Sequence, residues 1–403
     1  MGNSAVVAGG AVHVYGNNFN MRIEDCTFRA NTCLDYGGAM AINSGNYYMN
    51  FTKCIFDSNE ASSYGGALAL LSDNRYVVVS ECSFDNNIAG LAGGAYYSLV
   101  LNTFTTIEQS SFVSNVATLY GGALYFGNNH QQMSFLLCEM NDNGAESGAG
   151  VYIAGFNNGF TFDSCNVEHN QAVNVGGGVY CLGEDVTFAN CFIHNNTAKT
   201  GGGLYFQSGS ERQSQKCSVL NSSFISNVGY TTSGAMAIDL VADVEVRDCI
   251  FEANTAYHGS GALGISRSDM VNISNSRFLG NKCPSNGGGL YLTRSSHVAL
   301  HNTSFEENVA IVGGAMWIHS CSDVEVSHCI LYHNVASLKG GGMFLNSSQQ
   351  VLITSSSFES NVARTSSGSV IWADQTEPLE LDMNYFANNT GNHCRCHCII
   401  ATN

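Results

Sequence analysis

Thiol and imidazole side chains gather near the C-terminal end of the sequence. The segment GNHCRCHCIIATN contains His393, Cys394, Cys396, His397 and Cys398. A cluster of this kind could bind zinc. On a strand, however, the spacing C-x-C-x-C directs all three thiols to one face, whereas a closed zinc site normally takes ligands from two segments. We therefore expect no bound metal, and we predict that these cysteines form disulfides that close or extend the last repeat.

The cysteines elsewhere in the chain fall into two groups. One group shares a single position of the repeat described below, where Ser or Thr replaces Cys in other repeats, so we expect buried, unpaired thiols there: Cys26, Cys54, Cys82, Cys138, Cys165, Cys191, Cys249 and Cys329. Neighbouring thiols of that group point in parallel, which is poor geometry for a bridge. The other group is predicted to form disulfides and comprises Cys33, Cys181, Cys217, Cys283, Cys321, Cys394, Cys396 and Cys398.

Aromatic side chains form a column four residues after the first glycine of successive repeats. Its members are Tyr97, Tyr125, Tyr152, Tyr180, Tyr205, Tyr291, Trp317 and Phe344. The adjacent positions, such as Leu124 and Phe126, are more uniformly apolar, so we expect the column to face outward. An outward aromatic ladder could bind sugar rings or a protein. Two alternatives stay open, namely that the rings stack on one another for stability and that they belong to the core.

Seven N-x-S/T sequons are candidates for glycosylation in a eukaryotic secretory pathway. They begin at Asn50, Asn195, Asn221, Asn272, Asn302, Asn346 and Asn388. A sequence rich in Asn, Ser and Thr contains several such triplets by chance.

Catalysis on a polysaccharide would need a carboxylate pair, or carboxylates with a Lys or Arg base and calcium. The chain has only five lysines, and no column of the repeat gathers Asp, His and Arg over neighbouring turns. The calcium-binding pattern GGxGxDxUx does not occur either. We therefore expect a protein without catalytic residues and without a cofactor, and keep a polysaccharide-active enzyme as an alternative.

These positions recur because the whole sequence is periodic. Gly-Gly-Ala or a close variant begins at positions 9, 37, 65, 93, 121, 148, 176, 201, 233, 260, 287, 313, 340 and 367, and most intervals are 27 or 28 residues. A fixed period of this size is typical of a solenoid, in which each repeat buries its apolar face against its neighbours. We predict one solenoid domain over residues 1–390, followed by a Cys/His-rich segment over residues 391–403.

Within each repeat the apolar residues alternate with period two, which indicates strands. In the repeat that contains Val77 and Val79, these two residues face inward, and so do Cys82 and Phe84 after a bend. Asn87 follows at a turn, where its amide can bond the same amide of the next repeat. The Gly-Gly pair marks a corner that excludes a Cβ atom. The expected fold is all-β, a single-stranded right-handed parallel β-helix of about fourteen turns with three short strands in each.

The paired motifs resemble the passenger repeats of the polymorphic membrane proteins of chlamydiae, which combine GGA[ILV] with FxxN. Here GGAV starts at Gly9 and GGAL at Gly65 and Gly121. FxxN begins at Phe28, Phe56, Phe84, Phe112, Phe224, Phe251, Phe278, Phe305, Phe358 and Phe386. The resemblance covers essentially the whole chain and implies an extracellular, surface-displayed adhesin or structural passenger. Since neither a leader nor that family's C-terminal barrel is visible, we expect a segment of a longer protein or a different lineage that uses the same repeat.

Charge and hydropathy restrict the partners. The formal net charge of −17 would repel nucleic acid and an anionic membrane surface. No run of eighteen apolar residues exists, so we expect no membrane insertion. The function we predict is a non-catalytic extracellular or cell-surface rod, structural or adhesive, which associates with itself end to end or laterally and could form a filament. An adhesin that binds glycans or proteins through the aromatic column is the alternative.

Overall fold

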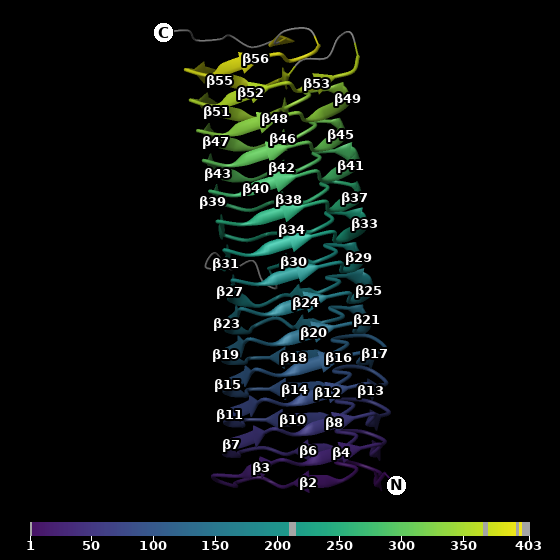
Figure 1. The fold of residues 1–403 in the computed structure, drawn as a ribbon. Helices are drawn as coiled ribbons and strands as arrows, with labels where there is room; N and C mark the ends of the chain where they lie inside the picture. Colours follow the sequence, from purple (N-terminus) through teal and green to yellow (C-terminus); the bar gives the residue numbers. More distant parts are fainter. Residues whose placement is uncertain (1, 209–214, 366–369, 392–394, 397–403) are drawn as a thin grey trace. The chain divides into compact units, whose positions relative to one another are not determined.

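Every regular element of the protein is a β-strand. The computed structural model describes residues 2–208, 215–365, 370–391 and 395–396, and within these residues no helix forms. Accordingly, none of the described residues belongs to a helix long and apolar enough to cross a membrane. The chain divides into two compact units, one of residues 1–199 with 203–210 and the other of residues 200–202 with 211–403. Figure 1 labels the strands.

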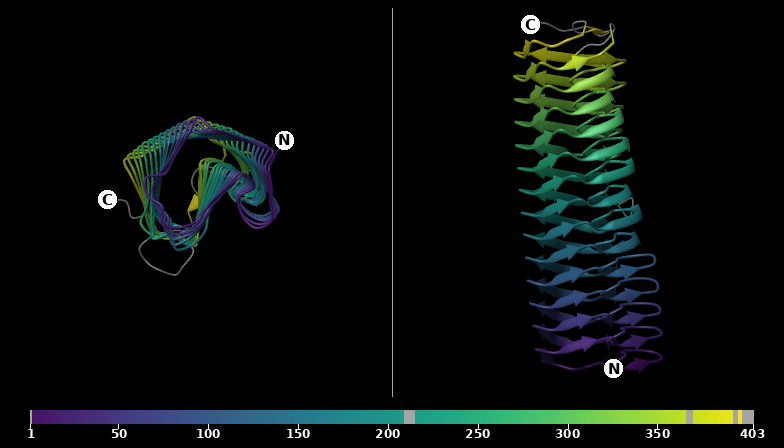
Figure 2. Two further views of the ribbon diagram at one scale, coloured as in Figure 1. Left: turned by 90° about the horizontal axis from the view of Figure 1, so that it is seen from below. Right: turned by 45° about the vertical axis from the view of Figure 1, so that its right-hand side comes forward.

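One turn of the first unit consists of four strands. These are β11 (Arg75–Ser80), β12 (Ser83–Asp85), β13 (Ile88–Ala89) and β14 (Tyr96–Val100). The next turn repeats them as β15 (Thr103–Glu108), β16 (Ser111–Val113), β17 (Val116–Ala117) and β18 (Leu124–Asn128). Each strand pairs in parallel with its counterpart, giving four sheets that we name A (β13, β17), B (β14, β18), C (β11, β15) and D (β12, β16). In Figure 2 the purple and blue turns of this unit follow the same outline.

The second unit has the same order of strands. One of its turns consists of β47 (Ser322–Ser327), β48 (Ile330–Tyr332), β49 (Val335–Lys339) and β50 (Met343–Asn346), in sheets C, D, A and B respectively. The next turn begins with β51 (Gln349–Thr354) and β52 (Ser357–Glu359), which pair in parallel with β47 and β48. The parallel β-helix predicted from the repeat is therefore confirmed in both units.

The number of strands per turn differs from the prediction of three. The additional strand belongs to sheet A and is only two residues long in β13 and β17, whereas later turns of the same unit have four or five residues, as in β21 (Gly144–Ser147) and β25 (Gln171–Val175). It forms because Ile88 pairs with Val116 and Ala89 with Ala117, so the residues that follow Asn87 and Asn115 remain extended. Two residues are too few to display a period, and the sequence pattern therefore indicates only a link at this place.

The core consists of stacked identical positions. Val77, Val79, Cys82 and Phe84 are all buried, as the alternation predicts. The rings of the FxxN column stack directly, with centroids 4.6 Å apart between Phe56 and Phe84 at an interplanar angle of 3°. Because each ring covers the next one, a turn buries its apolar side chains only when its neighbours are present.

A ladder of buried asparagines runs beside this core. Nδ2 of Asn87 donates to Oδ1 of Asn115 (3.0 Å) and to the carbonyl oxygen of Phe56 (2.9 Å). The backbone N–H of Asn87 donates to the same Oδ1 of Asn115 (2.9 Å). Each amide in the ladder thus ties together three turns, and it satisfies backbone groups that the corner would otherwise leave unpaired.

The Gly-Gly corner brings backbones of adjacent turns into contact. Gly93 has φ of 68°, in the left-handed region that favours glycine. A Cβ atom on Gly94 would lie 2.0 Å from the carbonyl oxygen of Gly122 and 2.7 Å from the backbone of Val116. This position therefore requires glycine because of the close approach.

The structure contradicts the predicted disulfides where it describes the cysteine side chains. None of the eight cysteines of the shared position forms a disulfide, and seven of them are buried while Cys26 is half-buried. Five members of the predicted disulfide group are described with their side chains, and these are buried and form no disulfide either: Cys33, Cys181, Cys217, Cys283 and Cys321. The physical reason is that they occupy inward positions too; Cys217, for example, pairs in register with Val244 and Cys283 with Ala310.

The disulfides predicted near the C-terminal end of the sequence are not tested by the structure. His393, Cys394, His397 and Cys398 lie outside the described residues, and Cys396 is described only as part of the backbone of β57 (Arg395–Cys396).

Candidate binding surfaces

The predicted aromatic column lies on the outer face of sheet B. In β18, Leu124 and Phe126 are fully buried whereas Tyr125 between them is half-buried, so its ring faces away from the core. Tyr97, Tyr152, Tyr180 and Tyr205 occupy the same register in the first unit.

These tyrosines pack on one another and are partly covered. The rings of Tyr97 and Tyr125 stack with centroids 5.1 Å apart. Tyr36 and Tyr64, from the bends before the Gly-Gly corner, pack against Tyr97 and leave it only 4% exposed. The bends therefore fold back over part of this face.

Burial of these rings shifts the pKa values of their phenol groups. Loss of water around its ring raises the pKa of Tyr180 to about 12, and burial raises the pKa of Tyr125 as well. The column thus contributes stacking within the protein, and only part of each ring is available to a partner.

The column resumes in the second unit. Tyr291 and Trp317 stack with centroids 4.4 Å apart, and Phe344 follows in register. The structure extends the column to Trp372, which pairs with Phe344 and was not predicted. The ammonium group of Lys339 lies 4.0 Å from the centre of the Trp372 ring, a cation–π contact.

A second aromatic ladder, which the sequence analysis missed, is much more exposed. We name Tyr48, Tyr76 and Phe104 the corner ladder, because each is the second residue of its sheet C strand: β7 (Tyr47–Thr52), β11 and β15. Their side chains are 50%, 40% and 41% exposed, and successive ring centroids lie 4.8 and 4.9 Å apart. All three residues have φ between 55° and 57°, a left-handed backbone that turns their rings outward.

The surroundings of the corner ladder are mixed in charge. Arg75 forms an ion pair with Asp73 (2.9 Å), and its guanidinium carbon lies 5.8 Å from the centre of the Tyr47 ring. The rings of the ladder stack on one another, and their side chains are nevertheless partly open to solvent. This combination of aromatic rings with hydrogen-bonding groups suits a glycan or a protein loop.

Five of the seven sequon asparagines are exposed, namely Asn195, Asn221, Asn272, Asn302 and Asn388. The other two, Asn50 and Asn346, are half-buried in strands of sheets C and B. Glycosylation of the exposed group stays a prediction.

Asp and His side chains meet on neighbouring turns of the second unit, although no column of the repeat gathers Asp, His and Arg together. Nδ1 of His297 lies 2.7 Å from Oδ1 of Asp269, and its Nε2 lies 4.0 Å from Oδ2 of Asp323. Val271 pairs with Val298, so Asp269 lies opposite Ser296 rather than opposite His297. Asp269 therefore lies outside the column that His297 shares with Asp323, so the repeat alone does not indicate the pair of Asp269 and His297.

The pair of Asp269 and His297 makes stability depend on pH. The hydrogen bond with Asp269 raises the pKa of His297, and the bond from His297 lowers the pKa of Asp269. The contribution of His297 is complete below the ordinary histidine pKa and is lost as the pH rises through the raised value. The contribution of Asp269 is lost as the pH falls through its lowered value. We expect His297→Gln to lower the melting temperature slightly near pH 5.5 and not near about pH 9. Thermal unfolding at both pH values measures this, and an equal change at both contradicts the ion pair.

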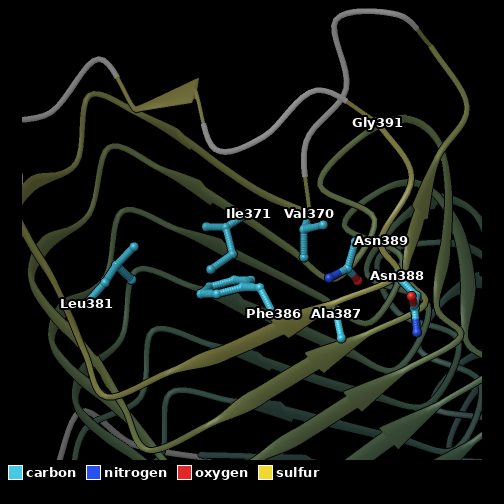
Figure 3. A pocket seen from close by; sticks show the side chains of 8 residues that line it. All are labelled: Val370, Ile371, Leu381, Phe386, Ala387, Asn388, Asn389 and Gly391. Atoms are coloured by element: carbon cyan, nitrogen blue, oxygen red, sulfur yellow. The ribbon is translucent and has the colours of Figure 1, made fainter.

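A pocket in the second unit belongs to the core. Its volume is about 340 Å³, and it is lined by Val370, Ile371, Leu381, Phe386, Ala387, Asn388, Asn389 and Gly391 (Figure 3). Leu381 continues the column of Ile353, and Phe386 continues that of Phe358. The inward columns of the fold therefore form this pocket.

The fold and these surfaces define a class of protein. Four parallel sheets wound through about fourteen turns of about 27 residues make a parallel β-solenoid, whose outer faces carry repeated side chains. The chain belongs to the family described as the right handed beta helix region, whose model matches residues 128–284 and 240–391. That family does not distinguish the chlamydial repeat from other β-helices. No curated protein matches the sequence.

Several solved structures are similar in fold. PfbA, a surface adhesin of Streptococcus pneumoniae, is 11% identical with a TM-score of 0.35, and the match covers 92% of this chain and 88% of that chain. The A-module of the mannuronan C-5 epimerase AlgE4 of Azotobacter vinelandii is 10% identical with a TM-score of 0.33, over 96% and 91% of the two chains. The tailspike of the E. coli bacteriophage HK620 is 11% identical with a TM-score of 0.34, over 96% and 73%. At these TM-scores the likenesses carry no argument about function.

Proposed function

We propose that the chain is an extracellular structural and adhesive scaffold, which contacts a surface glycan or protein through the corner ladder. The observation that carries the proposal is the exposure of three stacked aromatic rings, Tyr48, Tyr76 and Phe104, at successive turns of one corner. Aromatic side chains that are open to solvent and adjacent in space are typical of recognition surfaces.

The rest of the fold suits a scaffold. Inward positions and the asparagine ladder hold the turns together, so outward positions can vary without cost to the core. The resemblance to surface-displayed passenger repeats and the exposed sequons support an extracellular location. The low charge and the acidic balance support a partner other than nucleic acid.

Removing the rings tests the proposal. The triple substitution Tyr48→Asn, Tyr76→Asn and Phe104→Asn keeps the left-handed backbone, which Asn tolerates. We expect binding to an array of immobilised polysaccharides and matrix proteins to weaken at least about ten-fold, which corresponds to about 1.4 kcal/mol. The matched control is Leu137→Asn, an equally exposed apolar residue at another left-handed corner of the same unit.

Three results would contradict the adhesive role. They are binding of the triple variant at full strength, an equal loss in the Leu137→Asn control, and no binding of the unmodified chain to any component of the array.

One observation favours the enzyme alternative. The carboxylate of Asp269 lies within hydrogen-bond distance of His297, an arrangement that can tune a histidine as a general base. A polysaccharide depolymerisation assay separates the two functions. The scaffold predicts no new chain ends, whereas product release that disappears in His297→Gln would establish catalysis.

A further inference from the structure

The residues beneath the corner ladder form a buried column of their own. Each member stands at the corner where the chain passes from sheet B to sheet C, two residues before the position of the corner ladder in the same turn. We name these residues the support column. Its side chains are all fully buried: Asn46, Asn74, Asn102, His130 and Asn157. Four of them are amides, so the imidazole is the only titratable member.

Hydrogen bonds join the successive members of the support column. The backbone N–H of Asn46 donates to Oδ1 of Asn74 (3.1 Å), and that of Asn74 donates to Oδ1 of Asn102 (2.8 Å). The backbone N–H of Asn102 donates to Nδ1 of His130 (3.1 Å), and that of His130 donates to Oδ1 of Asn157 (2.7 Å). These bonds therefore hold the backbone from which the three rings of the corner ladder project.

The hydrogen bonds of His130 fix one protonation state of its ring. Nε2 lies 3.2 Å from the carbonyl oxygen of Ser98, which can only accept, so Nε2 carries the proton. Nδ1 then has no proton and accepts from the N–H of Asn102. The same Nδ1 lies 3.1 Å from the carbonyl oxygen of Asn102. A second proton on the ring would turn Nδ1 into a donor to that oxygen and leave the buried N–H of Asn102 without an acceptor.

The surroundings of the ring also disfavour a positive charge. Burial lowers the pKa of His130 to about 4, although its hydrogen bonds with Asn102 and Ser98 oppose the change. Among the described residues, no acidic side chain contributes to this shift, so a protonated ring would be a buried charge without a counter-charge. The other titratable side chains of β14, β15, β18 and β19 and of the corner before them are the buried Tyr96, whose pKa is raised by burial, and the outward-facing Tyr76, Tyr97, Tyr125, Glu108, Asp73 and Arg75.

We propose that His130 makes the corner ladder sensitive to acid, because protonation of its ring breaks the support column and the loosened corner releases its ligand. The release of a ligand rests on the proposed function of the corner ladder, whereas the opening of the corner does not.

The direction of the effect follows from the two states of the ring. An exposed histidine has a pKa of about 6.5, so an open corner takes up the proton more readily than the closed corner. The contribution of His130 to the stability of the closed corner is complete above about pH 6.5 and is lost as the pH falls towards about 4.

Hydrogen exchange of the full chain, corrected for the intrinsic effect of pH on exchange, measures the opening of β15 and β19. We expect the unmodified chain to open about 30-fold more often at about pH 5 than at about pH 7.5. His130→Asn supplies the amide that the other members of the column carry and takes up no proton, so its opening should change less than about three-fold. Binding to the array should weaken at about pH 5 in the unmodified chain and not in this variant.

The matched control is His169→Asn. It makes the same substitution in the same unit, at a histidine whose side chain is 54% exposed and whose left-handed backbone Asn tolerates. This control should open with acid as the unmodified chain does. Thermal unfolding checks that the variants fold, and His130→Gln, with a second amide that does not titrate, replaces the asparagine variant if that variant fails to fold.

Two outcomes would overturn the proposal. Opening that rises equally with acid in the unmodified chain and in His130→Asn, or in neither, would mean that His130 does not control the corner. Full binding at about pH 5 by a chain whose corner has opened would mean that the support column does not hold the contact surface. A chain that binds no component of the array contradicts the proposed function and the release of a ligand with it, whereas the exchange measurement still decides whether His130 opens the corner.

Discussion

Asn115→Ala is expected to destabilise the first unit by about 4 kcal/mol, because it leaves several buried hydrogen-bonding groups without partners. Oδ1 of Asn115 accepts from the backbone N–H and from Nδ2 of Asn87, and its Nδ2 donates to the carbonyl oxygen of Phe84 and to Oδ1 of Asn143. Alanine can make none of these bonds. The side chain is fully buried, so water cannot replace it.

Denaturant unfolding followed by circular dichroism measures the change. The control is Asn128→Ala, at an exposed residue that ends β18, for which we expect a change within about 0.5 kcal/mol. If both variants unfold at the same denaturant concentration as the unmodified chain, the ladder does not hold the turns together.

Gly94→Ala is expected to have the larger effect and to prevent folding of the turns around it. The new Cβ atom would lie 2.0 Å from the carbonyl oxygen of Gly122, which belongs to the backbone of the next turn and has no side-chain freedom. Relief requires a shift of that turn, and such a shift would separate the hydrogen bond from the N–H of Gly94 to the carbonyl oxygen of Gly121. We expect a loss of about 5 kcal/mol or more.

Limited proteolysis and far-ultraviolet circular dichroism report on this variant. Gly155→Ala is the matched substitution, because nothing lies within 4 Å of its Cβ position. It should fold normally, and a Gly94→Ala protein as resistant to protease as Gly155→Ala would contradict the close approach.

The sequence predicts those parts of the fold that each turn repeats. Phe84, Asn87 and the Gly-Gly corner occur at one spacing along the chain, and stacking of identical positions follows directly from that spacing. The alternation around Tyr125 likewise predicts the face on which its ring lies.

The surfaces are less predictable, because they depend on contacts between different positions of the repeat. Burial of Tyr97 depends on bends that contain Tyr36 and Tyr64 and fold back onto sheet B. The corner ladder occupies only three turns and precedes the alternating part of its strands. Its spacing of 28 residues therefore does not by itself indicate an outward-facing column. Asp269 and His297 meet across different columns, which no single-column pattern reveals.

Hydroxyl-radical footprinting of the chain, free and bound to the array component that retains it most strongly, tests the central claim most directly. The account predicts that Tyr76 is oxidised readily in the free chain while Tyr97 is protected, since they are 40% and 4% exposed. On binding, Tyr48, Tyr76 and Phe104 should become protected together. Protection of Tyr76 already in the free chain, or unchanged oxidation of all three rings on binding, would contradict the claim that the corner ladder is the contact surface.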